Sequence, residues 1–452
     1  MITALLILSL FLLIAAFPII NRLARGGLNP YSLILSAFGL ELVLVLLDPF
    51  NGKPVPGAIP SLRLGWVTLG AMMSLILGAI LGLRGSPNTS ASHATRLSAI
   101  PVITIICCLV SVVSLLDMVR KVGGFPLLIM GQSFAAGTGT TYSDYFTALF
   151  MYGLGICRVP AIVLAVDFVS SGQRFQDHLK ANAPWYGATL FTSAIMVLGG
   201  QRNCLFWPFV CWGGAYLLTN PKITRSVFPV VLGTLFLGWV FAFIGSLRFG
   251  AGSAASSALF SYYQAEIPDN VFTRSLIWLP TYMGPSLYNL NAALLSPYEP
   301  TMGRTLAMRT LPDSWLPGSF SGSEYIVEYL QTEDLMPLFG QTFRTAMADF
   351  YGEFGIPGAL IGPGLLIWLS ARAYRNARFS LRWCHLYIAT LPGVVMMPFV
   401  DFFTGSTNLI PLLSAFFIPW LFQSTTREGR PLPGQMGGKG GSIHPMGRVQ
   451  GS

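Results

Sequence analysis

Charged side chains are scarce in this sequence. Asp, Glu, Lys and Arg make up 10% of its 452 residues, hydrophobic residues make up 53%, and the mean hydropathy is +0.61. A water-soluble fold of this length needs far more charged surface. The composition therefore excludes an ordinary soluble enzyme and predicts a protein whose main solvent is lipid.

Histidine is rare and the cysteines form no pattern. The four histidines are scattered, and the six cysteines fall in or beside apolar stretches without a CxxC motif or a Cys/His ligand spacing. This pattern supports neither a disulfide framework nor a zinc site. We expect no metal and no cofactor.

The chain is rich in apolar runs long enough to cross a hydrocarbon core. Residues 2–20 carry no charge and lack the basic start of a cleaved signal peptide, so we expect them to stay as a helix. We predict an all-α polytopic membrane protein with about 11 (10–12) transmembrane helices. Their approximate ranges are 2–20, 31–47, 64–83, 98–116, 145–169, 184–200, 204–219, 227–246, 355–371, 383–402 and 408–422.

Basic residues crowd into alternate gaps between these spans. By the positive-inside rule these gaps are cytoplasmic, which places the N-terminus outside and the C-terminus inside. The net charge of +9 then faces anionic lipid headgroups, so we expect membrane lipids and not nucleic acid as a partner. Sixteen of the 27 basic residues lie in these gaps and the tail: Arg22, Arg25, Arg84, Arg96, Arg174, Lys180, Lys222, Arg225, Arg372, Arg375, Arg378, Arg382, Arg427, Arg430, Lys439 and Arg448.

One predicted external gap is far longer than the others. The predicted division is transmembrane helices 1–8 in 1–246, an external (periplasmic) cap loop of short helices in 247–354, helices 9–11 in 355–422, and a Gly/Pro-rich disordered cytoplasmic tail in 423–452. The loop combines aromatic, acidic and arginine side chains, as a sugar-binding surface requires. Routine surface charge is the alternative for most of them. The candidates for substrate binding are Arg344, Tyr351, Trp315 and Glu324.

Several arginines stand at unusual depths. Arg202 follows LGGQ in a tight predicted external turn, and Arg248 ends the eighth span at the same boundary. Either could instead be a lipid anchor. Arg158 lies near the middle of the fifth span, where an arginine costs about 2.5 kcal/mol or more and usually faces a polar cavity. Pro160 beside it can break the helix. Guanidinium groups so placed suit the phosphates of a lipid-linked substrate.

The segment entering the ninth span carries two carboxylates. Asp349 and Glu353 are four residues apart, so on a helix they share a face, and either is a candidate general base. A solvated pair, or Arg344 pairing with Asp349, is the alternative. The following GIPGALIGPG predicts close helix packing or a broken helix.

These residues resemble those of the Wzy-type polymerases, the O-antigen and enterobacterial-common-antigen repeat-unit polymerases of bacterial envelopes. The matching pieces occur in the family's order: GGQRN at 199–203, LRFG at 247–250, MRTLPDSWLPG at 308–318 and ADFYGEFGIPGAL at 348–360. Arg158 with Pro160 also stands where related polymerases carry an Arg before a Pro. The resemblance covers residues 140 to 375.

The resemblance implies a GT-C-like glycosyltransferase of the bacterial inner membrane. A hydroxyl of one undecaprenyl-pyrophosphate-linked oligosaccharide would attack the anomeric carbon of another and release undecaprenyl pyrophosphate. Arg202, Arg248 and, as further candidates, Arg158 or Arg309 would stabilise the leaving group. Asp349 or Glu353 would orient or deprotonate the hydroxyl. A chain-length regulator protein is a further expected partner.

Two other functions fit the same hydropathy. A lipid-linked sugar transporter or flippase also has many spans, but no internal repeat is visible here. An O-antigen ligase has a similar architecture and differs in its acceptor, lipid A-core. Ligases usually carry a functional histidine in the external loop, and residues 247–354 contain none. The sequence therefore favours the polymerase.

Overall fold

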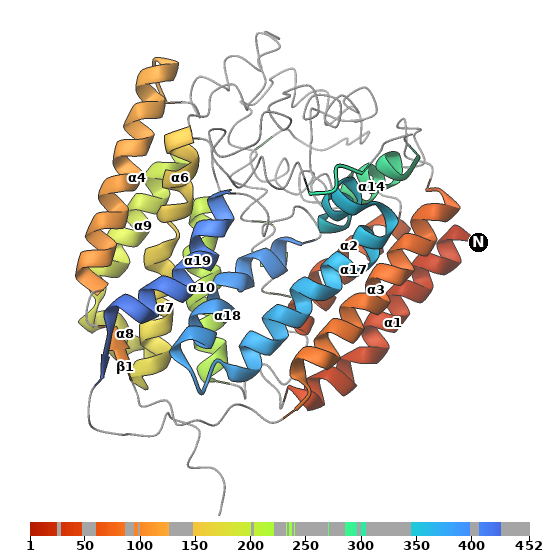
Figure 1. The fold of residues 1–452 in the computed structure, drawn as a ribbon, viewed down its shortest axis with the longest axis horizontal. Helices are drawn as coiled ribbons and strands as arrows, with labels where there is room; N and C mark the ends of the chain where they lie inside the picture. Colours follow the sequence, from red (N-terminus) through yellow and green to blue (C-terminus); the bar gives the residue numbers. More distant parts are fainter. Residues whose placement is uncertain are drawn as a thin grey trace, which may run out of the picture.

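The computed structural model describes most of the predicted spans. The described residues are 1–24, 29–47, 60–85, 95–97, 100–125, 148–199, 203–220, 285–295, 300–303, 345–397 and 406–425, with single positions at 232, 235, 236, 239 and 270. In these residues the protein is a bundle of α-helices with one pair of short strands (Figure 1).

Helices occupy ten of the eleven predicted span positions. They are α1 (Ile2–Leu23), α2 (Pro30–Leu47), α3 (Leu62–Leu83), α4 (Ile100–Val122), α6 (Ala148–Ile156) with α7 (Val159–Ser171), α9 (Ala183–Leu198), α10 (Asn203–Thr219), α17 (Ala346–Asn376), α18 (Leu381–Met396) and α19 (Ser406–Phe422). Two shorter helices are α8 (Phe175–Ala181) and α14 (Pro285–Leu295). The predicted span 227–246 lies outside the described residues, apart from single positions.

Within the part of the chain that the structure describes, five helices are long and apolar enough to cross a membrane. They are Ile2–Leu23, Leu62–Leu83, Ile100–Val122, Leu149–Ser171 and Ala346–Asn376, and four further apolar helices are shorter. Large apolar side chains such as Phe11, Leu109, Phe191 and Phe416 point outward, each more than half exposed. Such a surface is stable in lipid rather than in water. The protein is therefore an α-helical membrane protein.

The helices form two groups joined by α18. On one side α1, α2, α3 and α17 pack together, and on the other α4, α6, α7, α9 and α10 do so (Figure 1). The α3–α17 contact depends on glycines: a Cβ at Gly78 would lie 2.2 Å from the carbonyl oxygen of Gly364. A Cβ at Gly364 would lie 2.0 Å from Ser74 Oγ. The close packing predicted from GIPGALIGPG is confirmed.

One end of the bundle is marked by a two-stranded sheet, and we call it the sheet end. Strand β1 (Thr95–Leu97) pairs antiparallel with β2 (Gln423–Thr425). Residues 423–425, predicted to be disordered, are therefore ordered by strand pairing, and the rest of the tail lies outside the described residues.

The predicted cytoplasmic gaps meet at the sheet end. Tyr374 donates from its hydroxyl to the carbonyl oxygen of Ala24 at 3.5 Å, and Arg378 Nη2 donates to Leu218 O at 3.0 Å. Arg375 donates to the carbonyl oxygen of Arg84. The ends of α1, α3, α10 and α17 thus lie together, as the alternation of charged gaps predicts.

Helix α17 is broken near its start. Gly355 has φ 66° and ψ −154°, a backbone conformation almost restricted to glycine. A Cβ at Gly358 would lie 2.2 Å from the carbonyl oxygen of Phe350, so the chain folds sharply at the break. Residues 346–354 form a short helix of their own, capped by Thr345, whose hydroxyl accepts from the Ala348 amide at 3.1 Å. The predicted broken helix is confirmed.

Candidate functional site

Arg158 lies at the break between α6 and α7. Ile156 ends α6, Val159 begins α7, and Pro160 occupies the first turn of α7, where its missing amide hydrogen costs no helical bond. The side chain is 1% exposed. The predicted interruption of the fifth span is confirmed, and it places a buried cation inside the bundle.

The guanidinium of Arg158 packs against the start of α10. Its central carbon lies 4.8 Å from the ring centre of Trp207, and the guanidinium lies beside the sulfur of Cys204. The sequence predicted a polar cavity here, whereas the guanidinium meets an indole ring and a thiol. A desolvated cation over an indole gains about 2 kcal/mol or more, which offsets part of its burial cost.

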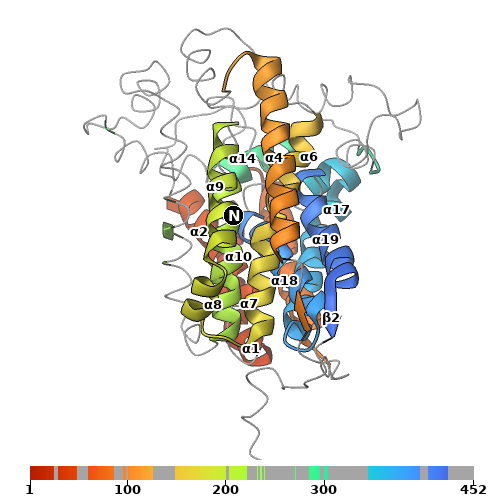
Figure 2. The ribbon, with the colours of Figure 1, turned by 90° about the vertical axis from the view of Figure 1, so that its left-hand side faces the viewer.

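The hairpin of α9 and α10 stops short of the end of the neighbouring helix α4. These two helices contain 16 and 17 residues, about 24 and 26 Å at 1.5 Å per residue, less than the roughly 30 Å hydrocarbon core. A Cβ at Gly199, which follows α9, would lie 3.2 Å from Leu115 Cδ1. Leu115 precedes the end of α4, Val122, by about 10 Å of helix. Figure 2 shows α4 extending beyond α9. Arg158, which packs against the start of α10, therefore lies beside the end of a hairpin that is shorter than α4.

The carboxylates of the short helix 346–354 are largely buried. Asp349 is 8% exposed and Glu353 is 7% exposed, so a solvent-exposed pair is wrong. Thr301 donates from its hydroxyl to Glu353 Oε2 at 2.7 Å, and the Met302 amide donates to the Glu353 carbonyl oxygen at 2.7 Å. Residues 300–303, which belong to the long loop, thus hold the Glu353 carboxylate in place.

Tyr351 lies between these carboxylates in sequence and is 6% exposed. The guanidinium carbon of Arg63 lies 6.0 Å from the centre of its ring, and Arg63 Nη1 donates to Leu294 O at 2.6 Å. The Ser61 amide donates to Asn291 Oδ1 at 2.9 Å. Helix α14 of the long loop therefore joins the start of α3 to this site. The sequence analysis did not predict Arg63 as a site residue.

A third buried carboxylate was also missed. Glu41, in the middle of α2, is fully buried and accepts a hydrogen bond from the hydroxyl of Ser286 in α14. It is the one charged residue in the predicted span 31–47, and a charge inside a span is by default a functional candidate. The sequence showed the charge of Glu41 inside a predicted span, but it did not show the partner Ser286, which lies 245 residues away.

The structure places the described candidates in two neighbouring parts of the bundle. Arg158 packs with α10, whereas Asp349, Tyr351 and Glu353 lie on α17, which packs with α3 and α14. Helix α18 packs against both α7 and α17 and so lies between them. The other candidates, Arg202, Arg248, Arg309, Arg344, Trp315 and Glu324, lie outside the described residues.

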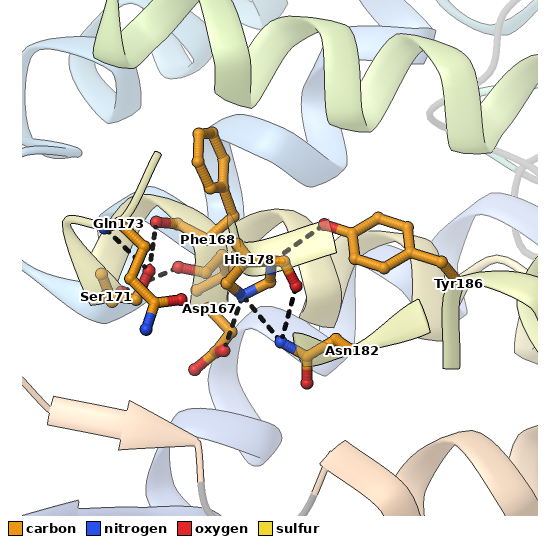
Figure 3. Close-up of polar contacts among 9 residues, drawn as sticks. Asp167, Phe168, Ser171, Gln173, His178, Asn182 and Tyr186 are labelled. Carbon is orange, nitrogen blue, oxygen red and sulfur yellow. Dashed lines mark hydrogen bonds and ion pairs between the residues drawn. The ribbon is translucent and has the colours of Figure 1, made fainter. Parts of the chain in front are cut away.

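A further polar cluster lies near the sheet end, between α7 and α9 (Figure 3). His178 of α8, 1% exposed, has Nε2 2.9 Å from Asp167 Oδ2 and Nδ1 3.2 Å from the Tyr186 hydroxyl. Asn182 Nδ2 donates to the His178 carbonyl oxygen at 3.2 Å. Phe168 packs edge-on against the imidazole. The cluster fixes the connection from α7 through α8 to α9, far from the head of the α9–α10 hairpin.

Comparison with known proteins does not place this chain in a group. No family model, no curated protein and no solved structure matches it.

Proposed function

We propose that the protein is a membrane-embedded glycosyltransferase that joins undecaprenyl-pyrophosphate-linked repeat units into a cell-surface polysaccharide, such as O-antigen or common antigen. The observation that carries this proposal is Arg158, a buried arginine held at a helix break against the start of α10. The GGQRN sequence, with Arg202, directly precedes and enters that helix. The resemblance to Wzy-type polymerases supports the same assignment.

The proposal includes the orientation of the chain in the bacterial inner membrane. Eleven spans would place the sheet end in the cytoplasm, with the N-terminus outside and the C-terminus inside. The gathering of Arg84, Arg375 and Arg378 at the sheet end supports this. The long loop, the α9–α10 connection and the short helix 346–354 would then face the periplasm.

The arginines would act on the leaving group. Cleavage of the anomeric bond leaves negative charge on pyrophosphate, and guanidinium groups fixed before the reaction stabilise that charge without reorganising. The contact with Trp207 would hold Arg158 in position, and Arg202, Arg248 and Arg309 would complete the set. Arg63, beside Tyr351, adds a cation on the opposite side of α18.

The carboxylates would act on the attacking hydroxyl. Asp349 and Glu353 share a face of the short helix, and Thr301 engages one oxygen of Glu353. A carboxylate held in this way can orient or deprotonate a sugar hydroxyl. The break at Gly355 would set the short helix at the membrane surface, where two lipid-linked sugars meet.

Conservative substitution of the arginines tests the proposal. Arg158→Lys and Arg202→Lys should each abolish the polymer ladder made from purified lipid-linked repeat units, because a point charge cannot reproduce the planar, two-pronged contact of a guanidinium. Arg174→Lys, an exposed residue at the sheet end, is the matched control and should polymerise normally. Normal ladders from both site variants would reduce the arginines to anchoring roles.

A further inference from the structure

Two thiols meet beside Arg158. The sulfur atoms of Cys157 and Cys204 lie 3.7 Å apart. Cys157 is 2% exposed, and Cys204 is fully buried. The other described cysteines have different surroundings: Cys211 donates to Ile388 O at 3.9 Å and Cys108 to Ala188 O at 3.8 Å. Among the described residues this pair stands out as two thiols in direct contact.

The positions of both cysteines leave room for a small movement. Cys157 lies in the turn between α6 and α7, and Cys204 is the second residue of α10. Helix ends open at a lower free energy than helix interiors. A disulfide requires the sulfur atoms to approach from 3.7 Å to about 2 Å.

The surroundings of Cys204 are those of a reactive cysteine. Its sulfur lies beside the Arg158 guanidinium, and it lies in the first turn of a helix. A neighbouring cation and a helix N-terminus favour the nucleophilic form of a thiol. Cys204 is therefore the attacking sulfur of the pair and Cys157 the resolving one.

We propose that Cys157 and Cys204 form an intramolecular disulfide by exchange with a low-molecular-weight disulfide. The Cys204 thiolate attacks one sulfur of that disulfide, forms a mixed disulfide and releases one thiol. The Cys157 thiolate then attacks Cys204 Sγ and releases the second thiol. The two cysteines lose two electrons and two protons, and the external disulfide becomes two thiols. The bond ties the α6–α7 break to the start of α10.

The bond also changes the neighbourhood of Arg158. Cys204 in a disulfide no longer carries a thiol beside the guanidinium, and the start of α10 is fixed to the turn that carries Arg158. This inference concerns the thiols alone and does not depend on the proposed glycosyltransferase activity.

The test is a count of free thiols on the full-length protein. Purified wild-type protein in detergent is incubated with oxidised glutathione, denatured, alkylated with N-ethylmaleimide, digested and analysed by mass spectrometry. We expect four of the six cysteines to be alkylated, six minus the linked pair, and one cross-linked peptide joining Cys157 to Cys204. Dithiothreitol should restore all six.

Single substitutions identify the pair. Cys157→Ser and Cys204→Ser should each lose the cross-link, and Cys204→Ser should also lose the mixed disulfide with glutathione at this site. Cys211→Ser, on the same helix, is the matched control and should retain the cross-link. Six alkylated cysteines in the treated wild-type protein, or a cross-link between a different pair, would overturn the proposal, and neither result needs a variant.

Discussion

Buried charge is costly in this protein, and four of the described buried charges have a specific neighbour. Arg158 stacks on Trp207, Glu353 accepts from Thr301, Glu41 accepts from Ser286, and Asp167 contacts His178. In a lipid environment such groups are rare and mark functional or structurally critical positions. Thr301 and Ser286 belong to the long loop, whereas the contact of Asp167 with His178 lies near the sheet end.

The carboxylates of the short helix carry a prediction at this scale. Asp349→Asn and Glu353→Gln keep the shape of each side chain and remove its charge. The variant that lacks the general base should therefore polymerise about 10²–10⁴-fold more slowly than wild type. The rate of conversion of purified lipid-linked units measures this. Asp177→Asn, an exposed change at the sheet end, is the control. Normal turnover by the Asp349→Asn, Glu353→Gln double variant would place the base elsewhere.

The connection between α7 and α9 illustrates how an element is held by a few polar contacts. His178, Asp167, Tyr186 and Asn182 close a buried network around α8, a helix of only 7 residues that could not persist alone. Helix α8 was not predicted, because its charged sequence indicates only a cytoplasmic gap between two spans.

Removal of the imidazole should weaken this connection. His178→Ala removes the described hydrogen-bond partner of Asp167 and of Tyr186 and should lower the free energy of unfolding by about 1–3 kcal/mol. The midpoint of thermal unfolding in detergent measures the loss. Because the cluster is distant from Arg158 and α17, polymerisation per folded molecule should be unchanged. A stability equal to that of wild type would show that the network is not structurally important.

The break in α17 depends on one glycine. Gly355→Ala forces a side chain into the φ 66°, ψ −154° conformation, which should cost about 1–3 kcal/mol and shift the short helix that carries Asp349 and Glu353. We expect both thermal stability and polymerisation rate to fall. Gly213→Ala is the control, since a Cβ there meets nothing within 4 Å. If Gly355→Ala matched this control in both measurements, the break would have no role in positioning the carboxylates.

The sequence predicted the positions of the helices more fully than it predicted the contacts between them. Ten predicted spans coincide with helices because apolar run length determines helix position in a membrane protein, and glycine and proline at 355–364 marked the break and the close packing of α17. The contacts of Glu41 with Ser286 and of Arg63 with Leu294 join residues 245 and 231 apart, and hydropathy carries no information on such pairs.

At the scale of the whole molecule, the two helix groups and the meeting of basic gaps define a bundle with unlike ends. The sheet end gathers β1, β2 and the arginines at the end of α17, whereas α14, residues 300–303 and the short helix 346–354 lie at the other (Figures 1 and 2). A membrane protein with this asymmetry is expected to place its basic end in the cytoplasm.

Reporter fusions test that orientation. A reporter fused after Arg378 should read cytoplasmic and one fused near Glu324 should read external, because the charge asymmetry is strongest across α17. Fusions near Arg22 should agree with those after Arg378. A cytoplasmic signal at Glu324 would reverse the bundle and place the arginines and carboxylates on the wrong face for the proposed reaction.

The most direct test of the central proposal is reconstitution of the reaction with the purified protein alone. The protein in lipid nanodiscs is given one species of undecaprenyl-pyrophosphate-linked repeat unit, and the products are separated by mass. The proposal predicts lipid-linked dimers and longer chains together with free undecaprenyl pyrophosphate, one for each bond formed. The absence of dimers, together with transfer of single units to lipid A-core supplied as a second acceptor, would instead identify a ligase. Unchanged substrate would contradict the proposed polymerase.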